Sequence, residues 1–145
     1  MEDNGAVTDE LDMIADVSVD ARPPVGLSVA ATADQLAIVR TVVERALFID
    51  DWLIDDVADV KLGVDEICSQ LIAASDDDSR LELTLTVGPR GVLGQINGHL
   101  HAGVDISTAG FGWRVVEAVT DAQSVTYIDA GDRRQATIRF AKLRR

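Results

Sequence analysis

The sequence predicts an α+β domain: a two-layer sandwich in which three helices cover one face of a mixed sheet of about five strands. Two segments indicate this class. Residues 57–72 repeat apolar side chains at steps of three and four, which is the period of one helix face. Residues 80–87 alternate apolar and polar side chains, the pattern of a half-buried strand. Along the chain, strands and helices follow in the order strand, helix, helix, two strands, helix, two strands.

Charge and composition exclude several kinds of protein. Acidic residues outnumber basic ones 25 to 13 in 145 residues, so the formal net charge is −12. This charge opposes contact with a phosphate backbone, and we expect no direct nucleic-acid binding. No run approaches the roughly 18 apolar residues of a membrane span, and no apolar leader opens the chain. We therefore expect a cytoplasmic protein without membrane contact, in which the single cysteine, Cys68, is a buried apolar side chain.

The first 24 residues predict an acidic flexible tail, and residues 25–145 predict the folded domain. The tail carries seven carboxylates against Arg22 alone and ends with Pro23 and Pro24, which cannot donate backbone hydrogen bonds. A segment that folds on binding a partner is the alternative. A short strand follows at residues 25–31, and its position after proline favours the edge of the sheet.

Two helices come next. Thr32 and Gln35 have the spacing of a capping box, which predicts a helix from residue 36 to about residue 48. The central helix follows the apolar connection 52–54 and runs to about residue 74. Asp55 or Asp56 is expected to cap its first turn.

Two hairpins complete the sheet. Residues 80–87 pair with 92–97 across a Gly-Pro turn, and residues 124–128 pair with 135–143 across an Asp-Gly turn. Residues 98–108 have neither period and are predicted to form a loop. The third helix begins near Gly110 and Gly112, where backbone amides favour an anion; a tight packing turn explains the two glycines equally well. His99 and His101 lack a third ligand nearby, so a metal site is not expected there.

Glu66 and Gln70 are the candidate functional pair on the central helix. They lie four residues apart, so their side chains are one turn from each other and off the apolar face. Spacing alone leaves two interpretations open: a pair that performs chemistry, or a solvated carboxylate beside an ordinary helix-forming residue.

The element order, the segment LGVDEICSQLI and the later segment GFGWRVVEAVTD together resemble the GHKL (Bergerat-fold) ATPase domain. Within it they are similar to anti-sigma factors of the RsbW type, serine kinases that control alternative sigma factors in bacteria. The resemblance covers residues 25–143. It implies ATP and Mg²⁺ as cofactors, an alternative sigma factor and an anti-anti-sigma factor of the STAS type as partners, and a homodimer. Eleven arginines against two lysines are also typical of a high-GC actinobacterial source.

The family helix has the form VxExxxN, with a glutamate as general base and an asparagine that holds magnesium. The resemblance implies that Glu66 is the catalytic residue and that Gln70 stands at the metal-binding and cofactor-binding position of the asparagine. The extra methylene of glutamine moves its amide oxygen, and Mg²⁺ tolerates little departure from octahedral geometry.

The resemblance also implies the nucleotide contacts. In the family, the aspartate of a DxGxG segment receives the adenine amino group, and a second glycine motif lies at the helix after the lid. Here Asn97 and Gly98 take the place of the first motif, with an uncharged side chain at the aspartate, and Gly110 and Gly112 match the second.

The expected function is therefore that of an anti-sigma factor that sequesters an alternative sigma factor and represses its transcription, with degenerate or modulatory ATP binding. The alternative is an active ATP-dependent serine kinase that phosphorylates an anti-anti-sigma factor, with Glu66 as base. A third interpretation is a small α+β module in which the glycines only serve packing.

Overall fold

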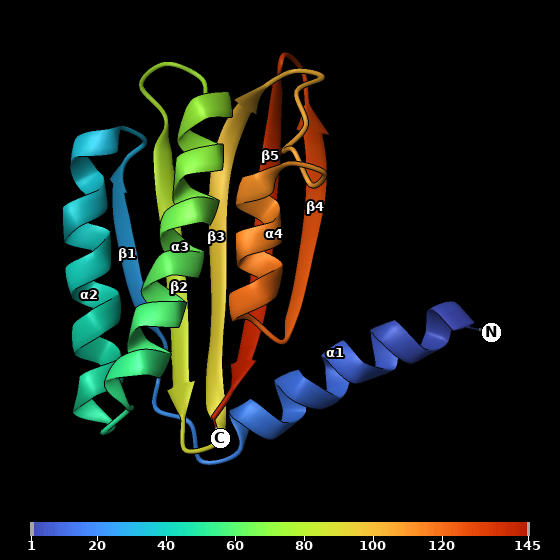
Figure 1. The fold of residues 1–145 in the computed structure, drawn as a ribbon. Coiled ribbons are helices and arrows are strands. Elements are labelled where there is room, and N and C mark those ends of the chain that lie inside the picture. Colours follow the sequence, from blue (N-terminus) through green and yellow to red (C-terminus); the bar gives the residue numbers. More distant parts are fainter. Residues whose placement is uncertain (1, 145) are drawn as a thin grey trace.

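One five-stranded sheet carries all the other elements of the protein (Figure 1). The structure is a computed structural model that describes residues 2–144. The elements, in chain order, are α1 (Glu2–Ser18), β1 (Val25–Ala30), a 3₁₀ turn (Ala33–Gln35), α2 (Leu36–Ile49), α3 (Ile54–Ala74), β2 (Arg80–Gly88), β3 (Gly91–His101), α4 (Phe111–Val119), β4 (Ala122–Ala130) and β5 (Arg133–Leu143).

The strand order is β1-β2-β3-β5-β4, and each neighbouring pair is antiparallel. The α+β class and the five strands are confirmed, whereas the expected mixed sheet is wrong. Helix α4 joins β3 to β4, a connection that gives parallel neighbours when the two strands lie side by side. Here β5 is inserted between them and pairs with both, so every adjacent pair runs in opposite directions.

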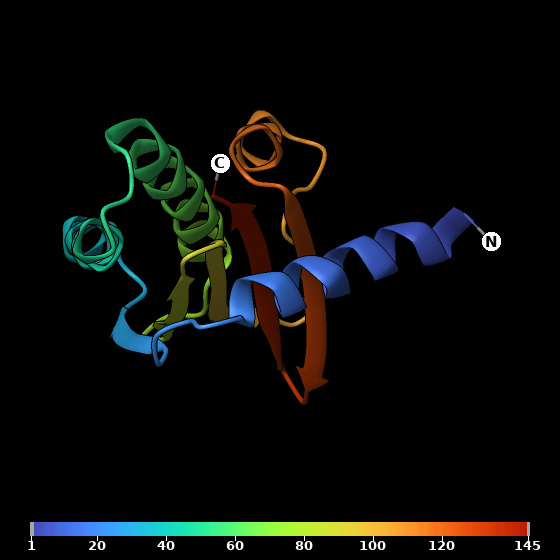
Figure 2. The same cartoon turned by 90° about the horizontal axis from the view of Figure 1, so that it is seen from below.

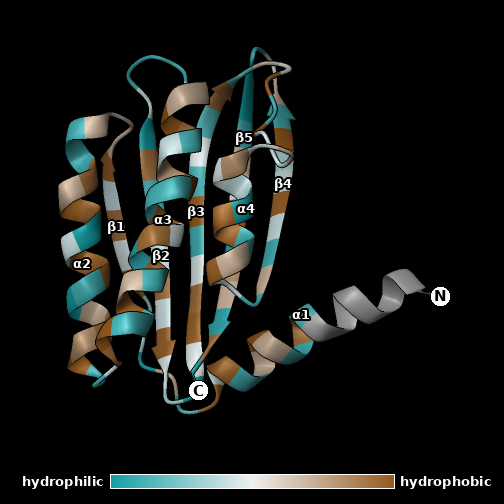
Figure 3. Ribbon diagram, viewed as in Figure 1, coloured by the Kyte–Doolittle hydropathy of each residue, from teal (hydrophilic) through white to brown (hydrophobic). Residues whose placement is uncertain are grey.

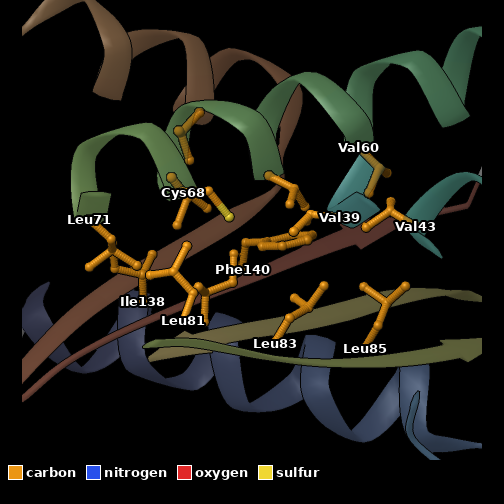
Figure 4. Close-up of a cluster of buried hydrophobic side chains, with 14 of the residues drawn as sticks. Val39, Val43, Val60, Cys68, Leu71, Leu81, Leu83, Leu85, Ile138 and Phe140 are labelled. Carbon is orange, nitrogen blue, oxygen red and sulfur yellow. The ribbon is translucent and has the colours of Figure 1, made fainter. Parts of the chain in front are cut away.

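Helices α2, α3 and α4 cover one face of the sheet, as predicted (Figures 1 and 2). The core lies between them and the strands, because the apolar period of each helix meets the alternating apolar residues of the sheet (Figures 3 and 4). Ile67 and Leu71 of α3 and Ile138 of β5 are fully buried there. Cys68 lies among them, and burial, reinforced by the nearby Asp65, raises the pKa of its thiol to about 12. The thiol is therefore uncharged and unreactive, as its apolar surroundings predicted.

Residues 2–18 form helix α1, where the sequence predicted an acidic tail without regular structure. Its C-terminal part packs against β2, β3, β4 and β5, and its N-terminal part extends past the edge of the sheet (Figures 1 and 2). Val17 is fully buried, and a Cβ atom at Gly88 would lie 2.5 Å from the Val17 carbonyl oxygen. The close approach of α1 to the β2–β3 turn thus depends on glycine. Whether residue 24 divides a tail from a domain stays a prediction.

Three local predictions are corrected by the structure. Strand β3 continues to His101, because its end pairs with β5 and its His99 carbonyl accepts the Asp76 amide at 2.9 Å. The N-cap of α3 is Leu53, which makes no side-chain cap bond, and not an aspartate. Thr32 precedes a 3₁₀ turn and donates to the Asp34 carboxylate instead of capping α2.

No helix within residues 2–144 combines the length and the apolar character that crossing a membrane requires.

Candidate functional site

Glu66 and Gln70 of α3 face the first turn of α4. Their spacing of four places them one above the other on the same side of the helix. A Cβ atom at Gly112 would lie 2.8 Å from Glu66 Oε2 and 3.2 Å from the Gln70 side-chain amide. The structure therefore brings together three of the residues that the sequence singled out, and the absence of a side chain at Gly112 leaves room for both.

The Gln70 side-chain amide forms hydrogen bonds with two backbone groups of the protein. In the orientation that satisfies both polar atoms, its nitrogen donates to the Ser107 carbonyl at 3.0 Å and its oxygen accepts from the Trp113 amide at 3.3 Å. One side chain of α3 thus holds the loop before α4 and the first turn of α4. A shorter asparagine at this position would not span the same two groups from the same backbone.

The Glu66 carboxylate lies at the N-terminal end of α4. Backbone amides without helical partners and the helix dipole favour negative charge at such an end. Gly110, the N-cap of α4, makes no side-chain cap bond, and Phe111 at the next position is exposed. The negative charge nearest the Gly112 backbone is therefore supplied by α3, from within the chain.

The loop 102–110 connects β3 to α4 and is tied to the β4–β5 hairpin. Arg134 bonds Asp105 and the Val104 carbonyl on the loop and Asp129 on β4. Its guanidinium lies 4.9 Å from the centre of the Tyr127 ring, and the Tyr127 hydroxyl accepts the Ile106 amide at 2.8 Å. The hydrogen bond from Arg134 lowers the pKa of Asp129 below its ordinary value.

A cavity of about 400 Å³ lies between α3, this loop and the start of α4. Its volume is within the range of about 300–1,000 Å³ typical of small-molecule pockets. The lining is mostly apolar, with a few polar groups. Its residues are Gln70, Ala73, Ala74, Val104, Asp105, Ile106, Ser107, Gly110 and Gly112.

Asn97 and Gly98 do not join this site. Ile96 is fully buried under the helices, and Asn97, next along β3, points to the opposite face, where its side-chain oxygen accepts from Thr137 at 2.8 Å. Gly98 packs beneath α3: a Cβ atom there would lie 3.0 Å from Leu71. The structure therefore does not bring Asn97 and Gly98 to the α3–α4 site, and β3 ends four residues later than predicted. Their assignment to adenine recognition stays a prediction.

The stretch that follows the end of β3 reads His101-Ala102-Gly103-Val104-Asp105. It keeps the middle glycine of the DxGxG spacing, with φ of 77°, but has histidine and aspartate in its first and last places. The spacing was a signal that could have located the segment. Ser107, Tyr127 and Arg134 were also missed, because no local pattern marks residues that meet only through the fold.

Within the described residues, 2–144, no group of three or more His, Cys, Asp or Glu side chains is arranged to hold a metal ion. His101 pairs with Asp76 at 2.5 Å, and Arg133 approaches the same carboxylate at 3.4 Å. This cluster joins the end of β3 to the loop after α3.

The fold and the α3–α4 site define the class as an α+β domain in which three helices cover one face of an antiparallel five-stranded sheet. No family model matches the chain. Two solved structures share the fold. The SiaB–SiaC complex of Pseudomonas aeruginosa has a TM-score of 0.68 at 8% identity, over 90% of this chain and 96% of that one. The RsbU and RsbW domains of a Mycobacterium tuberculosis protein have a TM-score of 0.60 at 16% identity, over 86% of this chain and 33% of that one.

Sequence comparison gives the narrower relationship. Anti-sigma-F factor RsbW, in two strains of Mycobacterium tuberculosis, is 32% identical over 97 residues, which are 67% of this chain. The chain matches 58% of the length of these relatives. The chain therefore belongs to the RsbW family, as the sequence predicted.

Proposed function

We propose that this protein is an anti-sigma factor that sequesters an alternative sigma factor, and that its α3–α4 site no longer supports kinase chemistry. The relatives at 32% identity are named anti-sigma-F factor, which supports the first part. The second part is carried by one observation: the Gln70 amide lies between two backbone groups of the chain, and in the orientation that satisfies both of its polar atoms it bonds them both.

A Gln70 amide that reached a metal would have to leave both partners. The Ser107 carbonyl and the Trp113 amide would then lose their bonds to Gln70, each of which contributes about 0.5–1.5 kcal/mol. Magnesium requires near-ideal geometry, and phosphoryl transfer depends on its placement. The residues present therefore do not fit Mg²⁺ at Gln70, and we route no chemical step through it.

The Glu66 carboxylate supports the same conclusion for the phosphates. It lies where the amides of α4 face outward, so an incoming anion would meet a negative charge at close range. The cavity beside it remains wide enough for part of a nucleotide, which fits weak or modulatory ATP binding.

The negative charge of the protein supports a sigma factor as its partner. A net charge of −12 complements the basic DNA-binding surfaces of a sigma factor and speeds the encounter with it. We propose further that a STAS-type anti-anti-sigma factor releases the sigma factor, that the active form is a cytoplasmic homodimer, and that no nucleic acid or membrane is contacted directly.

The test is a calorimetric titration of the protein with alternative sigma factors, with and without ATP and Mg²⁺. We expect binding whose affinity changes by less than about threefold on adding nucleotide, a difference of roughly 0.6 kcal/mol. Gln70→Asn is the matched variant, since it restores the shorter amide. Sigma binding that the native chain shows only with ATP and Mg²⁺ would contradict the proposal, as would binding of no sigma factor.

A second candidate function, an ATP-dependent serine kinase acting on an anti-anti-sigma factor, is favoured by the retained glutamate and the cavity. Glu66 would then deprotonate the substrate hydroxyl. Transfer of labelled phosphate to a STAS-type protein by the native chain, abolished in Glu66→Ala, would establish this function. No transfer by either protein is the result expected from sequestration alone.

A further inference from the structure

A second surface lies at the end of the molecule opposite to the loop 102–110. It is formed by the C-terminus of α2 and the connection to α3, at the lower end in Figure 1, and we call it the α2–α3 surface. Its apolar members are Phe48, Ile49, Leu53 and Ile54. Ile49 is 58% exposed, Leu53 67% and Ile54 74%.

This clustering is unusual for a surface without a partner. Single exposed apolar residues are normal, but four large ones fall within seven positions here, at one connection between two helices. Apolar residues gathered on a surface often mark interaction sites. Trp52, between Asp51 and Leu53, is buried at 3% exposure, so the segment is anchored to the core while its neighbours point outward.

Leu53 is a second, independent indication of a binding surface, because helix stability does not explain an apolar residue at its position. It occupies the N-cap of α3, where serine, threonine, aspartate and asparagine are preferred because their side chains bond the free amides. Leu53 makes no such bond. An apolar residue that breaks a local rule and buries little of itself is typical of a functional position.

The surface also has hollows that would receive side chains. Ile49 lines a groove of about 440 Å³ together with Asp20, Asp50 and Asp51, and also a smaller hollow of about 110 Å³ beside Val25. Arg22 lines both and pairs with Asp50 at 2.6 Å, and Arg144 lines the first and donates to the Asp51 carbonyl.

The aspartates beside these apolar residues indicate which kind of partner binds there. Asp50, Asp51, Asp55 and Asp56 alternate with or flank the apolar residues, so the rim is acidic despite Arg22 and Arg144. A second copy docked face to face would bring the two sets of aspartates together, which is unfavourable. A cationic partner with one apolar face satisfies both features at once.

We propose that the α2–α3 surface docks a basic amphipathic helix of another protein. The leucine-like side chains of that helix rest on Ile49, Leu53 and Ile54, and its lysine or arginine side chains meet the aspartates. The proposal is independent of the nucleotide state of the α3–α4 site, which lies at the other end of α3.

The probe is a fluorescently labelled 18-residue peptide of leucine and lysine, with leucines spaced on one helix face, titrated against the full chain by anisotropy. We expect the double variant Leu53→Ser/Ile54→Ser to weaken binding by about tenfold or more, as for truncated hot-spot residues. Ile128→Ser on β4, 65% exposed, is the matched control, with an expected change below about twofold.

The charge requirement is tested separately. Asp55→Asn/Asp56→Asn is expected to weaken binding and to flatten its dependence on salt, and a leucine-glutamate peptide of the same pattern is expected not to bind. Circular dichroism of each variant is the check that it is folded.

Equal peptide affinity in the Leu53→Ser/Ile54→Ser and Ile128→Ser variants would overturn the proposal. So would equal binding of the glutamate peptide. Self-association of the native chain in sedimentation, lost only in the Leu53→Ser/Ile54→Ser variant, would assign the surface to a second copy instead.

Discussion

Gly94 shows how tightly single residues constrain this fold. It lies in β3 opposite Phe140, and the aromatic ring occupies the space of the missing side chain: a Cβ atom would lie 2.1 Å from Phe140 Cε1. Phe140 is 3% exposed and packed under the helices, so its ring has no room to retreat.

Gly94→Ala is therefore expected to destabilise the protein by about 1–3 kcal/mol, the usual cost of overpacking a core. Gly26→Ala in β1 is the control, because nothing lies within 4 Å of its added methyl. Urea unfolding of both variants measures the difference. Equal stabilities would show that the ring is not held as described.

Gln70 acts at the same scale but through hydrogen bonds. Gln70→Ala removes the bonds to Ser107 and Trp113, and we expect a loss of about 0.5–1.5 kcal/mol for each. Hydrogen exchange should report the loss of the bond to Trp113 directly, as faster exchange of the Trp113 amide. Gln70→Glu keeps the length and the acceptor but loses the donor to Ser107, so it should protect Trp113 better than alanine does. Unchanged exchange in Gln70→Ala would contradict the bridge and, with it, the argument against magnesium.

At the scale of elements, α3 begins without a side-chain cap. Leu53→Ser supplies one, and Asp56 three residues later completes a favourable N-terminal pattern. We expect the variant to be more stable by about 0.5–1.5 kcal/mol, measured by thermal or urea unfolding. Ile54→Ser, which removes a neighbouring exposed side chain without adding a cap, should not be stabilised. A destabilised Leu53→Ser protein would mean that Leu53 serves packing.

Arg134, which bonds the loop 102–110, also makes a pH-sensitive contact with Asp129 of the same hairpin. The folded-state pKa of Asp129 is lowered from 3.8 by its hydrogen bond with Arg134, so the pair is fully formed above that pH and is lost as the pH falls through the lower value. We expect the NMR signals of the Arg134 side chain and of the Ile106 amide to shift together below about pH 4. Asp129→Asn is the control, and it should abolish the shift. A shift that persists in Asp129→Asn would contradict this assignment.

The sequence predicted the positions of the helices and strands better than it predicted where they end or which residues meet in the folded protein. The helices α2, α3 and α4 and both hairpins were predicted, because their apolar periods are set by the core they share. The last four residues of β3 were missed, since Gly98, His99 and His101 lack strand propensity and are ordered by pairing with β5. Glu66, Gln70 and Gly112 were found together through their motif spacing, whereas Arg134 and Tyr127 reach the loop only through tertiary contacts.

At the scale of the whole molecule, α1 decides how the second face of the sheet is covered. Nothing in the sequence predicted that this helix packs on the sheet, because its apolar residues are few. Yet Val17 is fully buried at the β2–β3 turn, Asp16 pairs with Arg90 at 2.6 Å, and a cavity of about 210 Å³ remains between Ile14 and the strands.

Removing residues 1–24 should leave the sheet and α2–α4 folded but less stable, by about 1.5–3 kcal/mol for the lost burial of one large aliphatic side chain. Urea unfolding of residues 25–145 against the full chain gives the value. The variant Val17→Ser in the full chain should reproduce most of the loss. Equal stability of the shortened and full chains would indicate that α1 contributes nothing to folding.

The insertion of β5 between β3 and β4 has a consequence for how the protein is made. Among the five strands β5 comes last in the sequence, so until it has been synthesised β3 lacks its second neighbour and β4 has no partner strand. Domains fold as units when their long-range pairings become possible. A nascent chain halted before β5 should therefore expose an incomplete sheet and attract chaperones, and the surfaces described above exist only after synthesis has passed this strand.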